Sequence, residues 1–330
     1  MRRRVGSFLL ALSIALVPAA AACSEGSEVS RISDDRIKES SGLAISSEHQ
    51  DLAYTVNDAG NAPVVYGIRI STGEVIGTTR IGGGAVKDSE SIAIDGDGTM
   101  WVSDLGDNDA ERGDVALYAF PEPGPGDHSV EAKRYAVTYD GGAVDIEAFL
   151  VHPDTGAKFL VSKEKKKGGT LYALPDELAA DRANQASDLG EQMPEDVSDG
   201  TFTSDGSQVL IRTRESVYVF DPESWQEVEQ LSVPEVEQGE SIAMEPDGKS
   251  FIIGSEGKDS PLIRVPFGPD AAEESAAPTP AEEDTREGAQ SDEGEESNGV
   301  NIPIYLVVAV VAVGILGLVA VWVARRRQDL

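Results

Sequence analysis

The sequence has little cysteine, little histidine and few basic residues. Cys23 is the single cysteine, so no disulfide can form within the chain, and the three scattered histidines disfavour a zinc or copper site. The 330 residues carry 27 Lys and Arg against 59 Asp and Glu, a formal net charge of −32. Nucleic acid is therefore a poor candidate partner, because phosphate binding needs the opposite sign of charge. Cations and basic protein surfaces are better candidate partners for a chain with this charge.

Several common catalytic motifs are also missing. The sequence contains no G-x-S-x-G, no H-E-x-x-H and no G-x-x-x-x-G-K-[ST]. A serine-hydrolase elbow, a zinc-protease helix and a phosphate-binding loop therefore have no support. Metal–carboxylate sites need none of these motifs, so hydrolysis by a metal-bound water stays open.

Long apolar runs stand at the two ends. The basic residues 2–4, the apolar run 8–17 and the alanines 19–22 have the three parts of a secretory signal, so we expect residues 1–23 to be a signal peptide. Cys23 then has two interpretations. It is the lipidated cysteine of a bacterial lipobox, with Ala20 where leucine is usual, or it follows an ordinary A-x-A cleavage site.

The second apolar run, residues 304–324, is uncharged and ends at three arginines. Its length of about 20 residues suits a transmembrane helix, and the arginines indicate a short cytoplasmic tail, residues 325–330. Residues 268–301 hold eleven acidic residues against Arg286 and no aromatic residue, which predicts a disordered, extended stalk. We therefore expect a single-pass membrane protein whose residues 24–267 form an extracellular domain.

Five segments of that domain share one pattern. Each has an apolar strand, a tight turn containing Gly and a second apolar strand, and Asp and Gly in the turns tolerate the positive φ of a hairpin. The segments are residues 41–58, 90–104, 147–163, 199–213 and 240–256.

A third strand-like run follows each hairpin, and a weaker fourth run follows in four units. Four antiparallel strands that recur every 41 to 57 residues predict an all-β fold, the β-propeller. The last unit lacks a fourth strand, which residues 28–37 could supply from the front. Closure by both termini predicts five blades without an open edge, and six blades is the alternative.

The motifs resemble those of a family of secreted bacterial propellers, common in actinobacteria. They stand here as DLGDN at residues 104–108 with Arg112 and PEP at 121–123, residues 145–163, and residues 239–266. The strand pattern is also similar to NHL-type and gluconolactonase-like propellers. The resemblance implies a propeller fold and a secreted location, and it implies no established activity.

In a propeller, residues that begin the first strand and end the second strand of each blade surround one mouth of the central channel. The first set is Ser41, Glu90, Glu147, Asp199 and Glu240; the second is Asn57–Asp58, Ser103–Asp104, Ser162–Lys163, Arg212–Thr213 and Ser255–Glu256. Converging carboxylates repel unless a cation, Lys163, Arg212 or protonation compensates them. Oxygen ligands favour a hard cation, calcium above all. The alternative is architectural: each acid accepts backbone N–H groups of a neighbouring blade.

The loop DLGDN has two interpretations as well. Alternating Asp and Asn suit calcium, although the loop lacks the terminal Glu of an EF-hand, and an Asp–Arg112 clamp explains the same residues. The candidate metal ligands are therefore Glu90, Glu147, Glu240, Asp104, Asp107 and Asn108.

Two functions follow from these observations. The first is a surface-displayed binding module for an extracellular protein, a glycan or a wall component, with a structural calcium site. The alternative is a calcium-dependent hydrolase of phosphoesterase or lactonase type.

Overall fold

The computed structural model describes residues 26–58, 60, 62–84, 86–164 and 167–268, all within the compact unit Met1–Ala277. All the secondary-structure elements in these residues are β-strands, which confirms the predicted all-β class. The predicted signal peptide, Cys23, the stalk beyond residue 268 and the membrane span lie outside the described residues. Within the described part, no helix is long and apolar enough to cross a membrane.

The described strands form four hydrogen-bonded sheets. The first contains β2 (Ser40–Ile45), β3 (Leu52–Asn57), β4 (Val64–Arg69), β5 (Val75–Gly82) and β9 (Gly126–Glu131). The second contains β6 (Ser91–Ile94), β7 (Thr99–Asp104), β8 (Ala116–Pro121), β10 (Lys133–Tyr139), β11 (Ile146–Val151), β12 (Lys158–Ser162), β13 (Thr170–Ala173) and β14 (Asn184–Gln192). The third contains β15 (Val197–Phe202), β16 (Val209–Thr213), β17 (Ser216–Phe220) and β18 (Glu227–Ser232). The fourth contains β19 (Gly239–Met244), β20 (Ser250–Ser255), β21 (Ser260–Pro266) and β1 (Ser27–Ile32).

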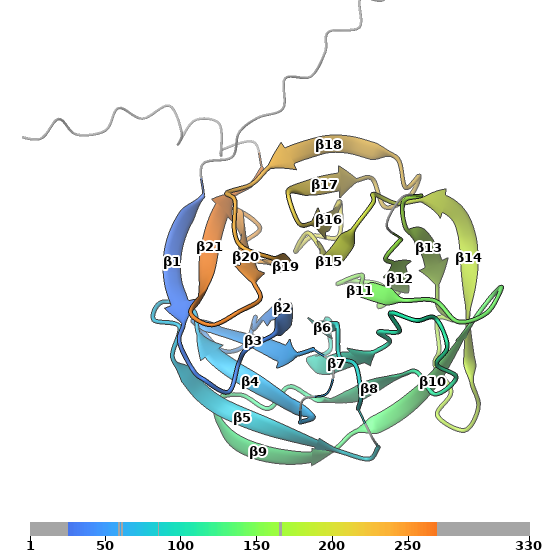
Figure 1. Ribbon diagram of the computed structural model, residues 1–330, viewed down its shortest axis with the longest axis horizontal. Helices are drawn as coiled ribbons and strands as arrows, with labels where there is room; N and C mark the ends of the chain where they lie inside the picture. Colours follow the sequence, from blue (N-terminus) through green and yellow to red (C-terminus); the bar gives the residue numbers. More distant parts are fainter. Residues whose placement is uncertain (1–25, 59, 61, 85, 165–166, 269–330) are drawn as a thin grey trace, which may run out of the picture. The chain divides into compact units, whose positions relative to one another are not determined.

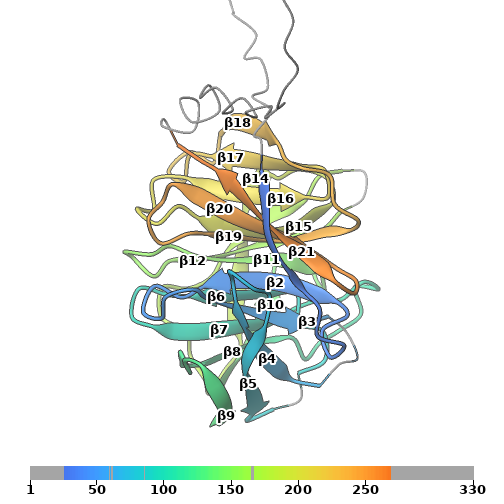
Figure 2. The same ribbon diagram turned by 90° about the vertical axis from the view of Figure 1, so that its left-hand side faces the viewer.

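The strands that begin each antiparallel group surround one axis (Figure 1). Strand β2 contacts β6, β6 contacts β11, β11 contacts β15, β15 contacts β19, and β19 contacts β2 again. The remaining strands of each group lie progressively further from this axis, and the sheets follow one another around it (Figures 1 and 2). This arrangement of radiating antiparallel sheets is a β-propeller.

The N-terminal strand completes the last sheet. Strand β1 pairs antiparallel with β21, with Ser27 opposite Arg264 and Ile32 opposite Ser260. The predicted strand, residues 28–37, is too long at its C-terminal end, because the chain turns after Ile32. Ile37 nevertheless packs with Ile32 in one core cluster. The N-terminal and C-terminal strands of the domain are therefore joined by backbone hydrogen bonds.

Two strand pairings were not foreseen from the sequence. After β8 of the second sheet, the chain forms β9, which pairs parallel with β5 at the outer side of the first sheet. The chain then returns as β10, which pairs with β8 and also runs parallel to β14. These pairings join neighbouring groups through backbone hydrogen bonds at their outer strands.

The core lies between neighbouring groups of strands. Leu117 of β8 and Phe149 of β11 share one cluster, and Leu210 of β16 and Ile253 of β20 share another. All four are at most 1 % exposed. Full burial of one such side chain contributes about 1.5–3 kcal/mol, so these interfaces hold the ring together and fix the positions of the inner strands.

Candidate functional site

A register shift at the start of the inner strands determines which side chains share a position. The shifts lie between Ile146 and Ala148 in β11, between Val197 and Asp199 in β15, and between Gly239 and Ser241 in β19. The extra residues are therefore Glu147, Ser198 and Glu240. Asp199 was predicted to be equivalent to Glu147 and Glu240, and this is wrong by one residue: it matches Ala148 and Ser241.

The displaced Asp199 has an architectural role. Its carboxylate is 1 % exposed and accepts hydrogen bonds from Ser91 Oγ on β6 (2.9 Å) and from the N–H of Ile242 on β19 (3.0 Å). The N–H of Leu43 on β2 also donates to it. One side chain on β15 thus ties together four of the five inner strands. For this residue the structure agrees with the architectural alternative.

Arg212 lies opposite Asp199 on β16 and is 0 % exposed. None of its three guanidinium nitrogens has a hydrogen-bond partner among the described residues. Burial lowers its pKa to about 10, and the charges of Glu240 and Asp199 oppose that shift. The second predicted set also needs correction here, because Thr213 and Arg214, rather than Arg212 and Thr213, match Ser162 and Lys163.

Three carboxylates come together at the channel mouth. Asp58 follows β3, and Asp88 and Glu90 lie in the segment that leads into β6. One oxygen of each lies within 4.8 Å of the other two. Glu90 is 3 % exposed, and Ser41 Oγ donates to its Oε2 over 3.1 Å. We call Asp58, Asp88 and Glu90 the acidic cluster.

The charges of this cluster disfavour full ionisation. Burial raises the pKa of Glu90 well above its ordinary range, and the charges of Glu147 and Asp58 raise it further. Burial also raises the pKa of Asp88 to about 7, with a hydrogen bond to Asp58 as the next cause. A bound cation would offset this repulsion, because it neutralises the carboxylates at the place where they meet.

The residues present fit a hard cation. All donors of the cluster are oxygens, and Asp88 Oδ1 is buried without a hydrogen-bond partner among the described residues. Gly106 forms one wall: an ideal Cβ there would lie 2.5 Å from Glu90 Oε1 and 2.8 Å from Asp88 Oδ2. Glycine at the centre of DLGDN therefore leaves room for the two carboxylates.

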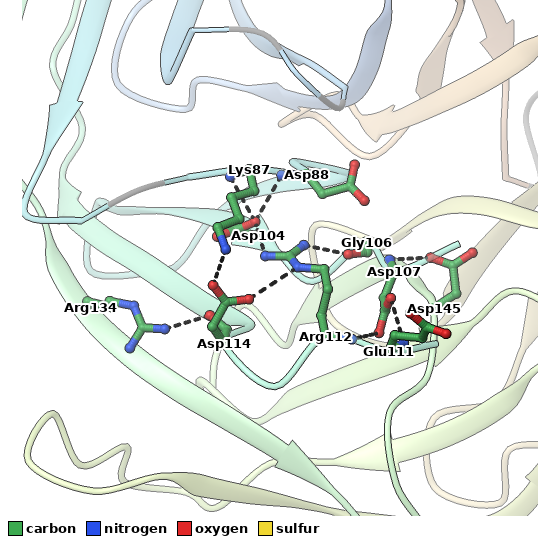
Figure 3. Close-up of polar contacts among 10 residues, drawn as sticks. All are labelled: Lys87, Asp88, Asp104, Gly106, Asp107, Glu111, Arg112, Asp114, Arg134 and Asp145. Atoms are coloured by element: carbon green, nitrogen blue, oxygen red, sulfur yellow. Dashed lines mark hydrogen bonds and ion pairs between the residues drawn. The ribbon is translucent and has the colours of Figure 1, made fainter. Parts of the chain in front are cut away.

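The rest of that loop is held by Arg112 (Figure 3). Arg112 Nη2 lies 2.8 Å from Asp104 Oδ1, and Nη1 donates to the carbonyl of Gly106. The same Asp104 oxygen accepts the N–H of Lys87 (3.1 Å) and of Asp88 (3.0 Å). The Asp–Arg112 clamp considered from the sequence is therefore present, and it holds the N–H groups of Lys87 and Asp88 and the carbonyl group of Gly106.

The remaining loop residues have other partners and are not members of the acidic cluster. Both carboxylate oxygens of Asp107 accept backbone N–H groups, from Glu111 (2.9 Å) and Arg112 (2.7 Å). The N–H of Asp107 donates to Asp145 Oδ1 over 2.7 Å (Figure 3). Asn108 is exposed and lines a cavity of about 430 Å³ together with Val144, Asp145 and Lys163, among others.

Glu147 and Glu240 have cationic partners. Lys163 Nζ lies 2.8 Å from Glu147 Oε1, and Arg214 Nη2 lies 3.8 Å from Glu240 Oε1. Burial still dominates: it raises the pKa of Glu147 to about 8 against the opposing charge of Lys163, and it raises the pKa of Glu240 to about 7. The protein's own cations therefore offset only part of the cost of burying these two acids.

Of the six predicted ligands, Glu90 alone belongs to the acidic cluster, and metal binding by any of the six stays a prediction. The cluster's other members, Asp58 and Asp88, were not among them. Two signals were available in the sequence: Asp58 belongs to the second predicted set, and Asp88 precedes Glu90 by two residues.

The fold and this mouth define the chain as a β-propeller. No protein-family model and no curated protein matches the sequence. Among solved structures, a gluconolactonase from Xanthomonas campestris is similar, with 14% sequence identity over 77% of this chain and 99% of its own, and a TM-score of 0.41. Membership of the actinobacterial propeller family stays a prediction.

Proposed function

We propose that this chain is a membrane-anchored, five-bladed propeller whose channel mouth binds a divalent cation, calcium above all, and serves as a binding module for an extracellular partner. The observation that carries the proposal is the acidic cluster, three carboxylates from two separate segments within 4.8 Å of one another. Asp58, Asp88 and Glu90 would hold the ion.

Calcium is favoured by the donor set and by the compartment. Calcium takes six to eight oxygen ligands in flexible geometry, whereas zinc and copper favour nitrogen and sulfur. A secreted location would expose the mouth to abundant calcium. The partner would be a protein, a glycan or a wall component that reaches the cavity beside the ion. Nucleic acid remains a poor candidate because of the net charge of −32.

The anchor is inferred from residues outside the described part. Residues 1–23 would direct export, 268–301 would form the stalk, and 304–324 would span the membrane, with 325–330 inside. Protease treatment of intact cells should then release the domain by cutting the stalk. A protected stalk together with a cleaved tail would contradict this orientation. Mass spectrometry of the mature N-terminus would decide whether Cys23 is lipidated.

Five blades are inferred from the closed order of inner strands and from β1, which supplies the outer strand of the last group. Six blades would need an additional four-stranded unit. An experimental structure of the domain would count them directly.

The cation site is tested by calorimetric titration of the full-length protein, in detergent, with calcium chloride. We expect one ion per chain and a rise in Tm, because a free calcium concentration of 100 times Kd stabilises the folded state by about 2.7 kcal/mol. Glu90→Gln keeps the acceptor for Ser41 and should reduce the affinity at least tenfold. Glu177→Gln, at an exposed position, is the matched control. The absence of any calcium binding by the wild type would overturn the proposal.

Calcium-dependent hydrolysis is a second candidate. Glu147, whose pKa burial raises to about 8, lies near enough to the cluster to raise the pKa of Glu90. A bound ion would supply an activated water, and a carboxylate whose pKa lies near neutral pH is suited to accept the proton of that water. A panel of phosphoesters and lactones, with and without calcium, tests this candidate. Turnover that requires calcium and is lost in Glu90→Gln would favour the enzyme over the binding module.

A further inference from the structure

Beside the acidic cluster, the channel mouth contains two further buried carboxylates, Glu147 and Glu240, which have Lys163 and Arg214 as their respective cationic partners. Glu147 is 2 % exposed and Glu240 is 6 % exposed, and each is the extra residue at the register shift of its inner strand. Lys163 Nζ lies 2.8 Å from Glu147 Oε1. The charge of the same ammonium group acts on Glu240 and Glu90 as well.

The position of Lys163 is equivalent to that of Asp58. Each is the first residue after the second strand of its group, since β3 ends at Asn57 and β12 ends at Ser162. The backbone bonds agree: the N–H of Asp58 donates to Glu39 O over 2.9 Å, and the N–H of Lys163 donates to Asp145 O over 2.9 Å. One position of the repeat therefore supplies a carboxylate in the group that begins with β2 and an ammonium group in the group that begins with β11.

We propose that Lys163 is a built-in counter-cation that occupies a second cation position, beside Glu147 of β11, and confines the divalent ion to Asp58, Asp88 and Glu90. The second half of this statement rests on the proposed function. The first half rests on the contact between Lys163 and Glu147 and on the position that Lys163 shares with Asp58.

Charge and access both support this role. Without the ammonium group, Glu147 would be left buried with no salt-bridge partner among the described residues, while Glu240 would keep Arg214 at 3.8 Å. Glu147 would then need protonation or a new cation, because burying uncompensated charge is costly. Lys163 also lines the cavity of about 430 Å³, and its side chain is 13 % exposed, so an ion can reach its position.

The test is the calcium stoichiometry of the full-length protein carrying Lys163→Met, measured by calorimetric titration. We expect the wild type to bind one ion and the variant two. Adding Glu147→Gln to the variant should return the count to one, because it removes a ligand of the new site. Lys249→Met, at an exposed lysine, is the matched control and should bind as the wild type does.

The outcomes separate this inference from the proposed function. One ion in both the wild type and Lys163→Met, or two in the wild type, would overturn the role of Lys163. No ion in the wild type and one in Lys163→Met would support the role of Lys163 and reject the proposed native site. No ion in either protein would reject both. If Lys163→Met is unfolded in chelator, recovery of its circular dichroism by calcium supports the inference, and failure to recover at any calcium concentration overturns it.

Discussion

The guanidinium group of Arg212 occupies the space in which a side chain on Gly239 would lie. An ideal Cβ on Gly239 would be 2.3 Å from Arg212 Nη2 and 2.9 Å from the carbonyl oxygen of Arg214. The glycine that opens the last repeat is therefore required by an arginine of the preceding group. This contact couples two neighbouring groups at the channel mouth.

Gly239→Ala should destabilise the domain by about 1–3 kcal/mol, because either the buried guanidinium or the backbone must move. Thermal melting of the full-length protein measures the change. Gly113→Ala is the matched control, since nothing lies within 4 Å of a Cβ at that exposed glycine. Equal melting temperatures for the two variants would show that Arg212 adapts without cost.

Gly106→Ala should reduce calcium affinity at least tenfold and change stability less. The new Cβ would meet the ends of the Glu90 and Asp88 side chains, which can move apart, but their movement separates the proposed ligands. Calorimetric titration and thermal melting in chelator distinguish the two effects. Unchanged affinity would mean that the ion, if bound, lies elsewhere.

Asp199→Ala should cost about 3 kcal/mol or more in the free energy of unfolding. It leaves Ser91 Oγ and the N–H of Ile242 without their acceptor and removes a negative charge that acts on Arg212. Denaturant unfolding measures the loss. Asp205→Ala, at an exposed aspartate whose carboxylate serves only its own turn, should cost about 1 kcal/mol. Similar losses of stability in the two variants would show that Asp199 does not join the inner strands in the way described.

Stability without calcium should fall as pH rises from 5 to 8. Burial raises the pKa of Glu240 from an ordinary value of 4.5 to about 7, so the folded state holds this proton more tightly than the unfolded state. The resulting stabilisation is complete below the unfolded pKa and is lost as pH passes through the folded pKa, a change of about 3 kcal/mol.

Melting temperatures in chelator across this pH range measure the trend. Glu240→Gln should make the fall shallower, because glutamine does not titrate, while Asp88 and Glu147, whose pKa values are also raised, still contribute. A wild-type curve that rises with pH would contradict the assignment of Glu240 as a buried, destabilised carboxylate.

Removal of residues 24–38 should destabilise the whole domain, because it strips β1 from β21 and exposes the edge of the last sheet. It also removes Ile32 and Ile37, each 1 % exposed. Thermal melting should show one cooperative transition at a lower temperature. An unchanged Tm would mean that β1 contributes nothing to closure.

Local chemistry in the sequence was enough to predict the class of fold. The turns containing Asp and Gly and the apolar strands around them produce hairpins such as β6–β7 and β19–β20, whose partners are close in the chain. The missing outer strand of the last repeat also pointed to residues 28–37, although the end of that strand depends on the turn after Ile32. The Asp–Arg112 clamp was visible as one of two alternatives because its residues lie within one loop.

The charge pattern at the channel mouth was decided by the tertiary structure. The same register shift occurs in β11, β15 and β19, and in β15 the extra residue is Ser198, so Asp199 lies one position further along, in the tie between strands. Asp58 and Glu90 are 32 residues apart in the sequence, and they meet only because β2 and β6 lie side by side around the axis. Lys163 and Arg214 lie within 4 Å of Glu147 and Glu240 through contacts that depend on how the strands are placed around the axis.

Residue types and turn spacing therefore determined that acids would gather at one mouth of a propeller. Strand register and packing between distant segments decided the role of each acid. They decided which acids keep their charge, which have a cationic partner and which join strands through hydrogen bonds. Hydrogen-bonded registers and packed interfaces are set cooperatively by many contacts across the chain, so no short stretch of sequence encodes them.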